Sequence, residues 1–430
     1  MPLSSPSPYP LQASLWRVAP LLLIFTMFMV PVPAMSEVDQ VASDVPGLLQ
    51  FDASLNLHQV VEATYASYPQ QAIIDAMQQE SQALEQRSDS WLPGYSQIYL
   101  QNNQNVAGDG EGMTQTGYQI PLWRWGQRDV SRNVTDKAIQ SSESFAHAVR
   151  LEVAGMLRER LWQMKLAENR LAFASSIYEV STQLVRTVKR RVELGDLAPQ
   201  DLLLAESDSL EKKTGLTQAE LDLQHAHQAY ANLSRLNRAP VHIEEELHTV
   251  KSVPEDHPAL FALNAMVERA QADVSFTREW KQGAQPTLLI GTQHRNFYTK
   301  GVQNDSNVVI QIPLGGDDYN APFVAQANLT LNQRITERNT LARDLERRFN
   351  QAEQSLAADR KALDIAQRRR EIAETQIRLN RLAFEAGEIH MIDFLKVQSA
   401  AQASIWDATL REIIMQRDIA AYHQVIGRVP

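Results

Sequence analysis

Apolar residues recur every three or four positions over unusually long stretches of this chain. Two such series are Ile177, Val180, Leu184 and Val188 in the first half, and Leu341, Leu345, Phe349, Ala352, Leu356 and Leu363 in the second. Steps of three, four and seven are typical of the narrow seam of a coiled coil. Because few glycines or prolines interrupt residues 121–195 and 313–387, we expect helices there of up to roughly 70 residues, about 100 Å long.

Four shorter segments alternate apolar and polar residues instead, which favours β-strands. The alternating series are Ser96, Ile98 and Leu100; Thr116, Tyr118, Ile120 and Leu122; Leu288, Ile290 and Thr292; and Val308, Ile310, Ile312 and Leu314. The pattern predicts two hairpins with one apolar face, as in the wall of a transmembrane β-barrel. Four strands leave two open edges, so closing a barrel requires further copies of the same chain.

The two halves of the chain repeat each other. The motif Gln-Ile-Pro-Leu at 119–122 returns at 311–314, and Gly195 with Asp201 returns as Gly387 with Asp393. Both pairs are 192 positions apart (311 − 119 and 387 − 195). A constant offset of this kind indicates a two-fold internal repeat.

Each repeat is predicted to contain a helix, a hairpin and a long helix pair. The long helices are expected to begin at about Gly126 and Phe323 and to end at turns where glycine fits a left-handed position. Shorter helices then return over 199–236 and 392–426. The predicted divisions are an N-terminal segment over 35–54, a first repeat over 55–238, a linker over 239–256 and a second repeat over 257–430.

The start of the chain has the pattern of a secretory signal. Arg17 carries the charge, residues 18–30 are apolar, and Val32-Pro33-Ala34 is a small-residue cleavage site. The apolar run is shorter than the roughly twenty residues that a spanning helix needs. We therefore expect a signal peptide over 1–34 and an exported chain.

Composition excludes several function classes. The formal net charge of −10 over 430 residues argues against a nucleic-acid-binding protein. Cysteine is absent, which excludes disulfides, thiolate catalysis, cysteine zinc sites and a lipid-anchored cysteine. No phosphate-binding loop or Ser/His/Asp order is present, so we expect neither an enzyme nor a cofactor. The alternatives are a trimeric coiled-coil surface adhesin or a structural envelope protein, although an adhesin would place one barrel segment at the C-terminus.

Two groups of residues allow two interpretations each. One is the linker group His242, Glu244, Glu245, Glu246 and His248; the other is the pair Trp123 and Trp125. The linker group has the ligand types of a cation site, but we favour a solvated charged loop because a metal site needs fixed geometry. The tryptophans either form an interfacial aromatic belt or pack where strand meets helix.

The order of these features resembles the outer membrane efflux protein family, the TolC-like channels of Gram-negative bacteria. The matching features are Leu55-x-Leu57 followed by Tyr68-Pro69, Leu92-Pro93, the Gln-Ile-Pro-Leu motif, Gly195-x5-Asp201-Leu202-Leu203-x-Ala205-Glu206, and Gly387-x5-Asp393-Phe394-Leu395-x2-Gln398. The resemblance covers essentially residues 55–428. Chain length and the short linker resemble the heavy-metal efflux branch more than the longer multidrug members.

The resemblance implies a fold, a location and partners. The fold is an α+β membrane protein: a homotrimer with a long α-helical coiled-coil barrel in the periplasm, and a transmembrane β-barrel in the outer membrane to which each protomer contributes four strands. The implied function is the channel of a tripartite efflux or type I secretion system, which conducts its substrates passively. The implied partners are a periplasmic adaptor (membrane fusion) protein, an inner-membrane pump of the RND or ABC type, and outer membrane lipid. Metal ions, drugs and proteins all remain open as cargo.

The resemblance also places the channel entrance at the two helix turns. The residues implied at the gate are Gly195, Asp201, Gly387, Asp393 and Lys396, and those implied at the adaptor-docking tip are Leu194, Gly195, Leu197, Ala386, Gly387 and Ile389. The chain departs from the family at three positions: Lys396 stands where a second acid can lie, Ile389 where some members have Arg, and Phe384 where some have Tyr. Around a three-fold axis, Asp201 and Asp393 would form a carboxylate ring that attracts cations.

Overall fold

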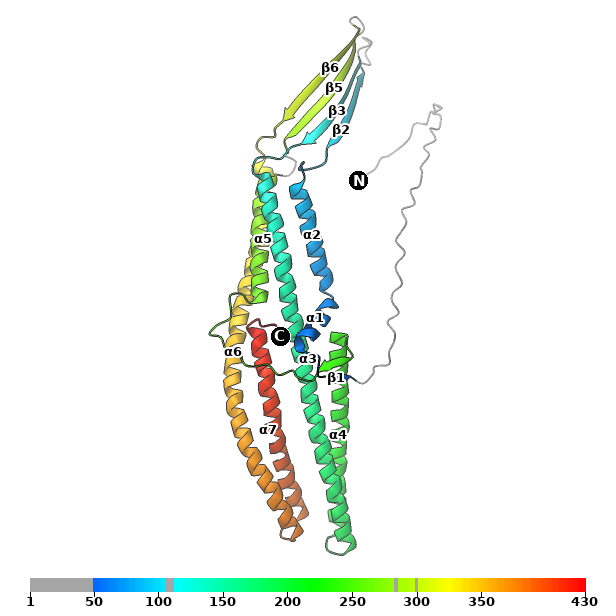
Figure 1. Ribbon diagram of the computed structural model, residues 1–430, viewed down its shortest axis with the longest axis vertical. Coiled ribbons are helices and arrows are strands. Elements are labelled where there is room, and N and C mark those ends of the chain that lie inside the picture. Colours follow the sequence, from blue (N-terminus) through cyan, green and yellow to red (C-terminus); the bar gives the residue numbers. More distant parts are fainter. Residues whose placement is uncertain (1–48, 105–111, 282–284, 298–300) are drawn as a thin grey trace, which may run out of the picture. The chain divides into compact units, whose positions relative to one another are not determined.

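The computed structural model describes residues 49–104, 112–281, 285–297 and 301–430 (Figure 1). The predicted signal peptide lies outside the described residues, as does most of the segment 35–54. Met1–Gly47 and Leu48–Pro430 are separate units, and the architecture below is that of the second unit. No helix in the described ranges combines the length and apolar character needed to cross a membrane.

Two very long helices dominate this unit. Helix α3 spans Gln127–Glu193 and α6 spans Asp317–Glu385, with 67 and 69 residues, so each is about 100 Å long. A shorter helix returns from each, α4 over Pro199–Ser234 and α7 over Met391–Val425. The predicted helix pairs are confirmed. Within the unit, each long helix connects the sheet at one end to a turn at the other (Figure 1).

Helix α6 begins before the predicted Phe323. Gly316, with φ 84°, precedes the helix, and Asp317 and Asp318 occupy its first turn, where carboxylates interact favourably with the positive end of the helix dipole. Pro322 lies inside the helix. It removes one N–H donor, but it does not end the helix, so the expected start was wrong by six residues.

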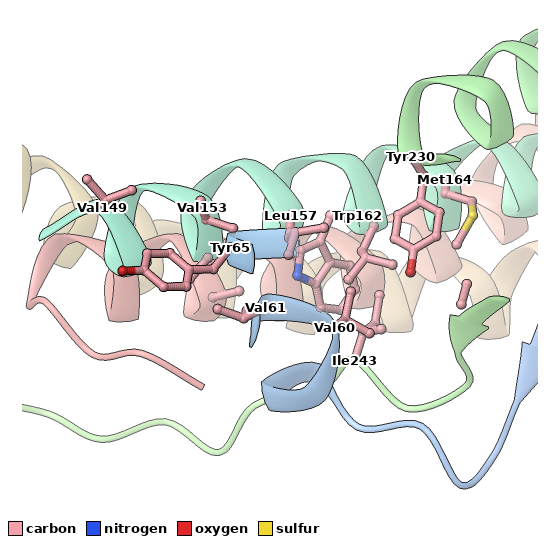
Figure 2. Close-up of a cluster of buried hydrophobic side chains, with 14 of the residues drawn as sticks. Val60, Val61, Tyr65, Val149, Val153, Leu157, Trp162, Met164, Tyr230 and Ile243 are labelled. Atoms are coloured by element: carbon pink, nitrogen blue, oxygen red, sulfur yellow. The ribbon is translucent and has the colours of Figure 1, made fainter. Parts of the chain in front are cut away.

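The remaining helices pack against the long helices. They are α1 over Leu57–Ala66, α2 over Gln71–Asp89 and α5 over Pro258–Trp280. Asn56 begins α1 with a capping box, since its side chain accepts from the backbone N–H of Gln59. Figure 2 shows the buried apolar residues that attach α1 to α3, with additions from α4 and the linker: Val60, Val61, Tyr65, Val149, Val153, Leu157, Trp162, Met164, Tyr230 and Ile243.

The strands form one antiparallel sheet of four in the order β2-β3-β5-β6. The strands are β2 over Gln97–Gln104, β3 over Gly112–Pro121, β5 over Thr287–Phe297 and β6 over Gly301–Gln311. Both predicted hairpins are confirmed, and β2 and β6 form the two edges. The sequence patterns do not predict a second, parallel pair, β1 over Gln50–Asp52 with β4 over Arg238–Pro240.

One face of the sheet is apolar and uncovered in the single chain. Ile98, Tyr118, Ile290 and Val308 are direct neighbours across the four strands, and between 45% and 77% of each is exposed. The next row along the same face consists of Ile120, Leu288 and Ile310. The predicted apolar face is therefore present, and it lies on the outside of the fold.

The helices near the turns also form a layer with two open edges. Helix α3 packs against α4 and α7, and α7 packs against α6, which gives the order α4-α3-α7-α6. The edge helices carry exposed apolar residues, namely Leu203, Leu210 and Leu221 on α4 and Ile365, Ile372, Leu379 and Leu382 on α6. The sheet and the layer of helices thus each have two edges that lack a partner within the single chain.

Candidate functional site

The two helix turns have the same geometry in both repeats. Gly195 and Gly387 adopt positive φ values of 83° and 77°. Residues with a side chain rarely adopt this left-handed conformation, whereas glycine does so readily. In the first turn, the N–H of Asp196 donates to the carbonyl of Arg191 at 2.8 Å; in the second, the N–H of Glu388 donates to that of Ala383 at 2.9 Å. We call these turns and the adjoining helix ends tip 1 (residues 184–205) and tip 2 (residues 380–398).

The two aspartates implied at the gate occupy equivalent positions. Asp201 lies in the first turn of α4 and Asp393 in the first turn of α7, where the helix dipole favours a negative charge. Asp201 is half-buried, whereas Asp393 and Lys396 are exposed. Among the described residues, neither Asp393 nor Lys396 forms an ion pair.

The residues implied at the docking tip fall into two sets. Leu194 is 69% exposed, and Gly195, Ala386 and Gly387 are exposed as well. In contrast, Leu197 and Ile389 are half-buried and pack against the apolar cluster between the tips. The structure therefore presents Leu194 and Gly195 at the end of tip 1 and Ala386 and Gly387 at the end of tip 2, supported by the half-buried Leu197 and Ile389.

The apolar cluster joins tip 1 to tip 2. Its buried members are Val188, Ala205, Phe384, Met391 and Phe394. Arg191 also bridges the tips, because its Nη1 donates to the carbonyl of Phe384 at 3.1 Å. The sequence patterns did not single out Arg191. The sequence offers one signal for this contact, the repeat. An offset of 192 aligns Arg191 with Ala383 (191 + 192), the residue before Phe384.

The linker is attached to the helices rather than solvated throughout. Glu245 accepts two hydrogen bonds from Arg158, at 2.8 and 2.7 Å, and lies 3.0 Å from Nδ1 of His423. The backbone N–H of His248 donates to Nε2 of His423 at 3.2 Å. For Glu245 the expected solvated loop was therefore wrong, because a buried arginine on α3 supplies its partner. No group of three metal-ligating side chains occurs among the described residues.

The tryptophans at the junction of sheet and helix differ from each other. The Nε1–H of Trp123 donates to the carbonyl of Ser90 at 3.2 Å, and its ring meets Trp280 edge to face. Trp123 is therefore a packing residue. Trp125 is fully exposed, and Trp91, Tyr95 and Tyr319, which also lie at junctions between helices and strands, are each more than 80% exposed. The interpretation as an interfacial belt fits this second group.

Long helix pairs that end in glycine turns and carry an open four-stranded sheet define the fold of TolC-like outer membrane channels. No family model matches the chain. The solved structure of CusC matches with a TM-score of 0.67 at 14% identity, covering 89% of this chain and 97% of CusC. The outer membrane protein VceC of Vibrio cholerae matches with a TM-score of 0.67 at 12% identity, covering 86% and 96%.

A similarity in sequence also points to outer membrane channels of this fold. The cobalt-zinc-cadmium resistance protein CzcC of Cupriavidus metallidurans is 25% identical over 309 residues, which cover 68% of this chain and 71% of CzcC. The resemblance to TolC-like channels and the fold inferred for the single chain are thereby confirmed, whereas the homotrimer stays a prediction.

Proposed function

We propose that this chain is the outer membrane channel of a tripartite efflux system in a Gram-negative bacterium. The observation that carries the proposal is the sheet, whose exposed apolar face and two unpaired edges suit a barrel wall in lipid. In a membrane each unpaired backbone group costs several kcal/mol. Edge strands β2 and β6 of one chain therefore need partners from others.

A homotrimer supplies these partners for the helices as well. The two edge helices run in opposite directions, α4 away from tip 1 and α6 towards tip 2, and both carry apolar residues at matching heights. Leu210 stands about 17 Å from the start of α4, and Ile372 about 20 Å from the end of α6. We infer that α4 of one protomer packs against α6 of the next.

The exposed aromatic residues support the outer membrane location. Trp91 and Tyr95 lie between α2 and β2, Trp125 lies between β3 and α3, and Tyr319 lies in the first turn of α6. Aromatic side chains favour the headgroup level of a bilayer. Their position corresponds to the inner surface of the membrane, with the helix pairs extending into the periplasm.

The tips are the proposed contact with a periplasmic adaptor and an inner-membrane pump. Their ends expose Leu194 and the two glycine turns, which is the surface available to a docking protein. The similarity to CzcC, which is named for resistance to cobalt, zinc and cadmium, favours a divalent metal cation as the cargo. The exposed carboxylate of Asp393 is compatible with a cation route.

Cysteine cross-linking tests the assembly. The native chain has no cysteine, so a double variant with Leu210→Cys and Ile372→Cys has only these two thiols. Mild oxidation in intact outer membranes should give covalent dimers and trimers. Glu211→Cys combined with Ile372→Cys is the matched control and should give none. A membrane-bound double variant that stays monomeric under oxidation and in native mass measurement would contradict the trimer.

A metal-sensitive host tests the cargo. Cells that lack the gene should tolerate a lower concentration of divalent metal than cells that carry it. Returning the wild-type gene to the same cells should restore the tolerated concentration. Cross-linking and co-purification from the native envelope should recover an adaptor and a pump. Unchanged metal tolerance with recovery of a drug or protein exporter would overturn the metal assignment while keeping the channel.

A further inference from the structure

We propose that Asp305 and Arg295 together set the charge selectivity of the β-barrel, because Asp305 cancels an arginine charge that would otherwise repel cations. The inference rests on the proposed function and adds two specificity-determining residues to it. It starts from the face of the sheet opposite the apolar rows, which lines the channel if the apolar face meets lipid. Successive residues of a strand point to opposite faces, so the register of the strands identifies the residues of this channel face.

The channel face is rich in amide side chains. One row across all four strands consists of Gln101, Gln115, Gln293 and Asp305. An amide carries no charge and offers both hydrogen-bond donors and an acceptor, so it can interact with hydrated ions of either sign. In the described parts of the four strands, the charged residues on this face are Arg295 and Asp305. Selection by charge within the barrel therefore depends on these two.

The two charges lie next to each other on neighbouring strands. Arg295 belongs to β5 and Asp305 to β6, and Nε of Arg295 lies 3.9 Å from Oδ2 of Asp305. Gln293 is opposite Asp305 and Gln303 is opposite Arg295, so the pair is diagonal, at a separation that long side chains can bridge. Three such pairs around a trimeric barrel would leave this part of the channel without net charge.

The pair contributes little to the stability of the sheet. The side chains of Arg295 and Asp305 are 43% and 38% exposed, and exposed ion pairs add little to stability. Among the described residues, the Nε–H of Arg295 has no hydrogen-bond acceptor, whereas Oδ1 of Asp305 accepts from Nε2 of Gln303 at 3.3 Å. The main effect of the pair is therefore on the charge of the channel, and neutral substitutions should leave the barrel folded.

Both charges would be close enough to the channel axis to act on a passing ion. Twelve strands spaced about 4.8 Å apart and tilted by about 40° give a wall with a radius of roughly 12 Å. Side chains extend inward from this wall, and the Debye length is about 8 Å at physiological ionic strength and about 30 Å at 0.01 M. Three arginines without their aspartates would therefore repel cations across the channel, most strongly at low salt.

Reversal potentials in planar bilayers test the inference. Measured across a KCl gradient at low total concentration, they give the ratio of cation to anion permeability. We expect Asp305→Asn to lower this ratio about threefold or more and Arg295→Gln to raise it, with the double variant close to wild type. Asn304→Asp is the matched control, because it adds a charge one residue from Asp305 on the opposite face and should leave the ratio unchanged.

A reporter thiol measures the same charges without any transport. The native chain has no cysteine, and Gln293→Cys places one thiol on the channel face, opposite Asp305. Its rates of reaction with a positively and a negatively charged methanethiosulfonate are compared in purified trimers at low salt. A unit charge about 7 Å away changes each rate roughly threefold. Asp305→Asn should therefore shift the ratio of the two rates about tenfold towards the negative reagent, and Arg295→Gln should shift it the other way.

The two measurements separate the charge pair from the channel itself. Unchanged permeability ratios in conducting, correctly trimeric Asp305→Asn and Arg295→Gln variants would overturn the inference, whatever the reaction rates of the thiol. Rate ratios that shift as expected in proteins that do not conduct, wild type included, would support the charge balance of this face and overturn the channel. Unchanged rate ratios in such proteins would overturn both.

Discussion

Arg158 and Glu245 form a two-pronged ion pair, with Nε to Oε1 at 2.8 Å and Nη2 to Oε2 at 2.7 Å. Arg158 belongs to α3 of the first repeat and Glu245 to the linker, and their side chains are only 4% and 13% exposed. Gln424 of α7 accepts a third hydrogen bond from Arg158 at 2.7 Å. A single buried arginine therefore joins both repeats and the segment between them.

Removing the carboxylate should destabilise the protein strongly. Glu245→Ala leaves the guanidinium of Arg158 buried without its counter-ion, and breaking a buried pair in this way costs about 3–5 kcal/mol. The free energy of unfolding in detergent, measured by denaturant titration, gives the value. Glu246→Ala, one residue on and exposed, should change it little. Equal effects of the two substitutions would mean that the pair is not structural.

The same carboxylate should make stability depend on pH. Burial raises the pKa of Glu245, but hydrogen bonds from His423 and Arg158 outweigh it, so the pKa lies below its ordinary value of 4.5. A group with a lowered folded-state pKa stabilises the fold above its unfolded-state pKa and loses this effect as the pH falls through the folded value.

The advantage of the wild type over Glu245→Gln should therefore be complete at neutral pH and shrink below about pH 4.5. Thermal unfolding of both proteins, followed by circular dichroism from pH 7 to pH 3, measures it. A difference between the two proteins that is constant with pH would contradict the assignment.

The fold was largely predictable because it is built from local patterns. Alternation predicts that the side chains of Ile98 and Tyr118 point to the apolar face of the sheet, and the structure makes the two residues direct neighbours. The glycine turns at Gly195 and Gly387 were predictable because a left-handed position favours one residue type. The start of α6 was not predictable, because a proline such as Pro322 is usually taken to interrupt a helix, although α6 continues through it.

The contacts at the site were less predictable for a physical reason. Arg191 and Phe384 are 193 residues apart, and Glu245 and Arg158 are 87 apart. The spacing of apolar and polar residues along the chain does not indicate which distant side chain contacts a helix end or a linker. A charged run such as 244–246 looks solvated until a buried partner on another element is known.

A tyrosine lies over two glycines on the face of the sheet opposite the apolar rows. A Cβ added at Gly117 would clash with the ring of Tyr99, and one added at Gly291 would lie 2.9 Å from its hydroxyl oxygen. If the apolar face meets lipid, this ring lines the channel and lies flat against the wall.

Gly117→Val should push Tyr99 into the channel and lower single-channel conductance, because keeping the ring in place would cost about 1–3 kcal/mol of overpacking. Adding Tyr99→Ala to Gly117→Val should restore conductance. Gly112→Ala is the control, since its added Cβ would meet only the carbonyl of Asn103 at 4.0 Å. A reduction that persists in the double variant would place the cause elsewhere than Tyr99.

The last prediction concerns Asp393. Three exposed copies around the entrance would attract cations, and Lys396, three residues further along α7, offers a partner between adjacent chains. We expect Asp393→Ala to raise single-channel conductance and to weaken block by divalent cations, with the trimer intact. Asp201→Ala should have the smaller effect, because Asp201 is half-buried against its own chain. Unchanged conductance and unchanged cation block in a trimeric Asp393→Ala variant would show that Asp393 does not line the entrance.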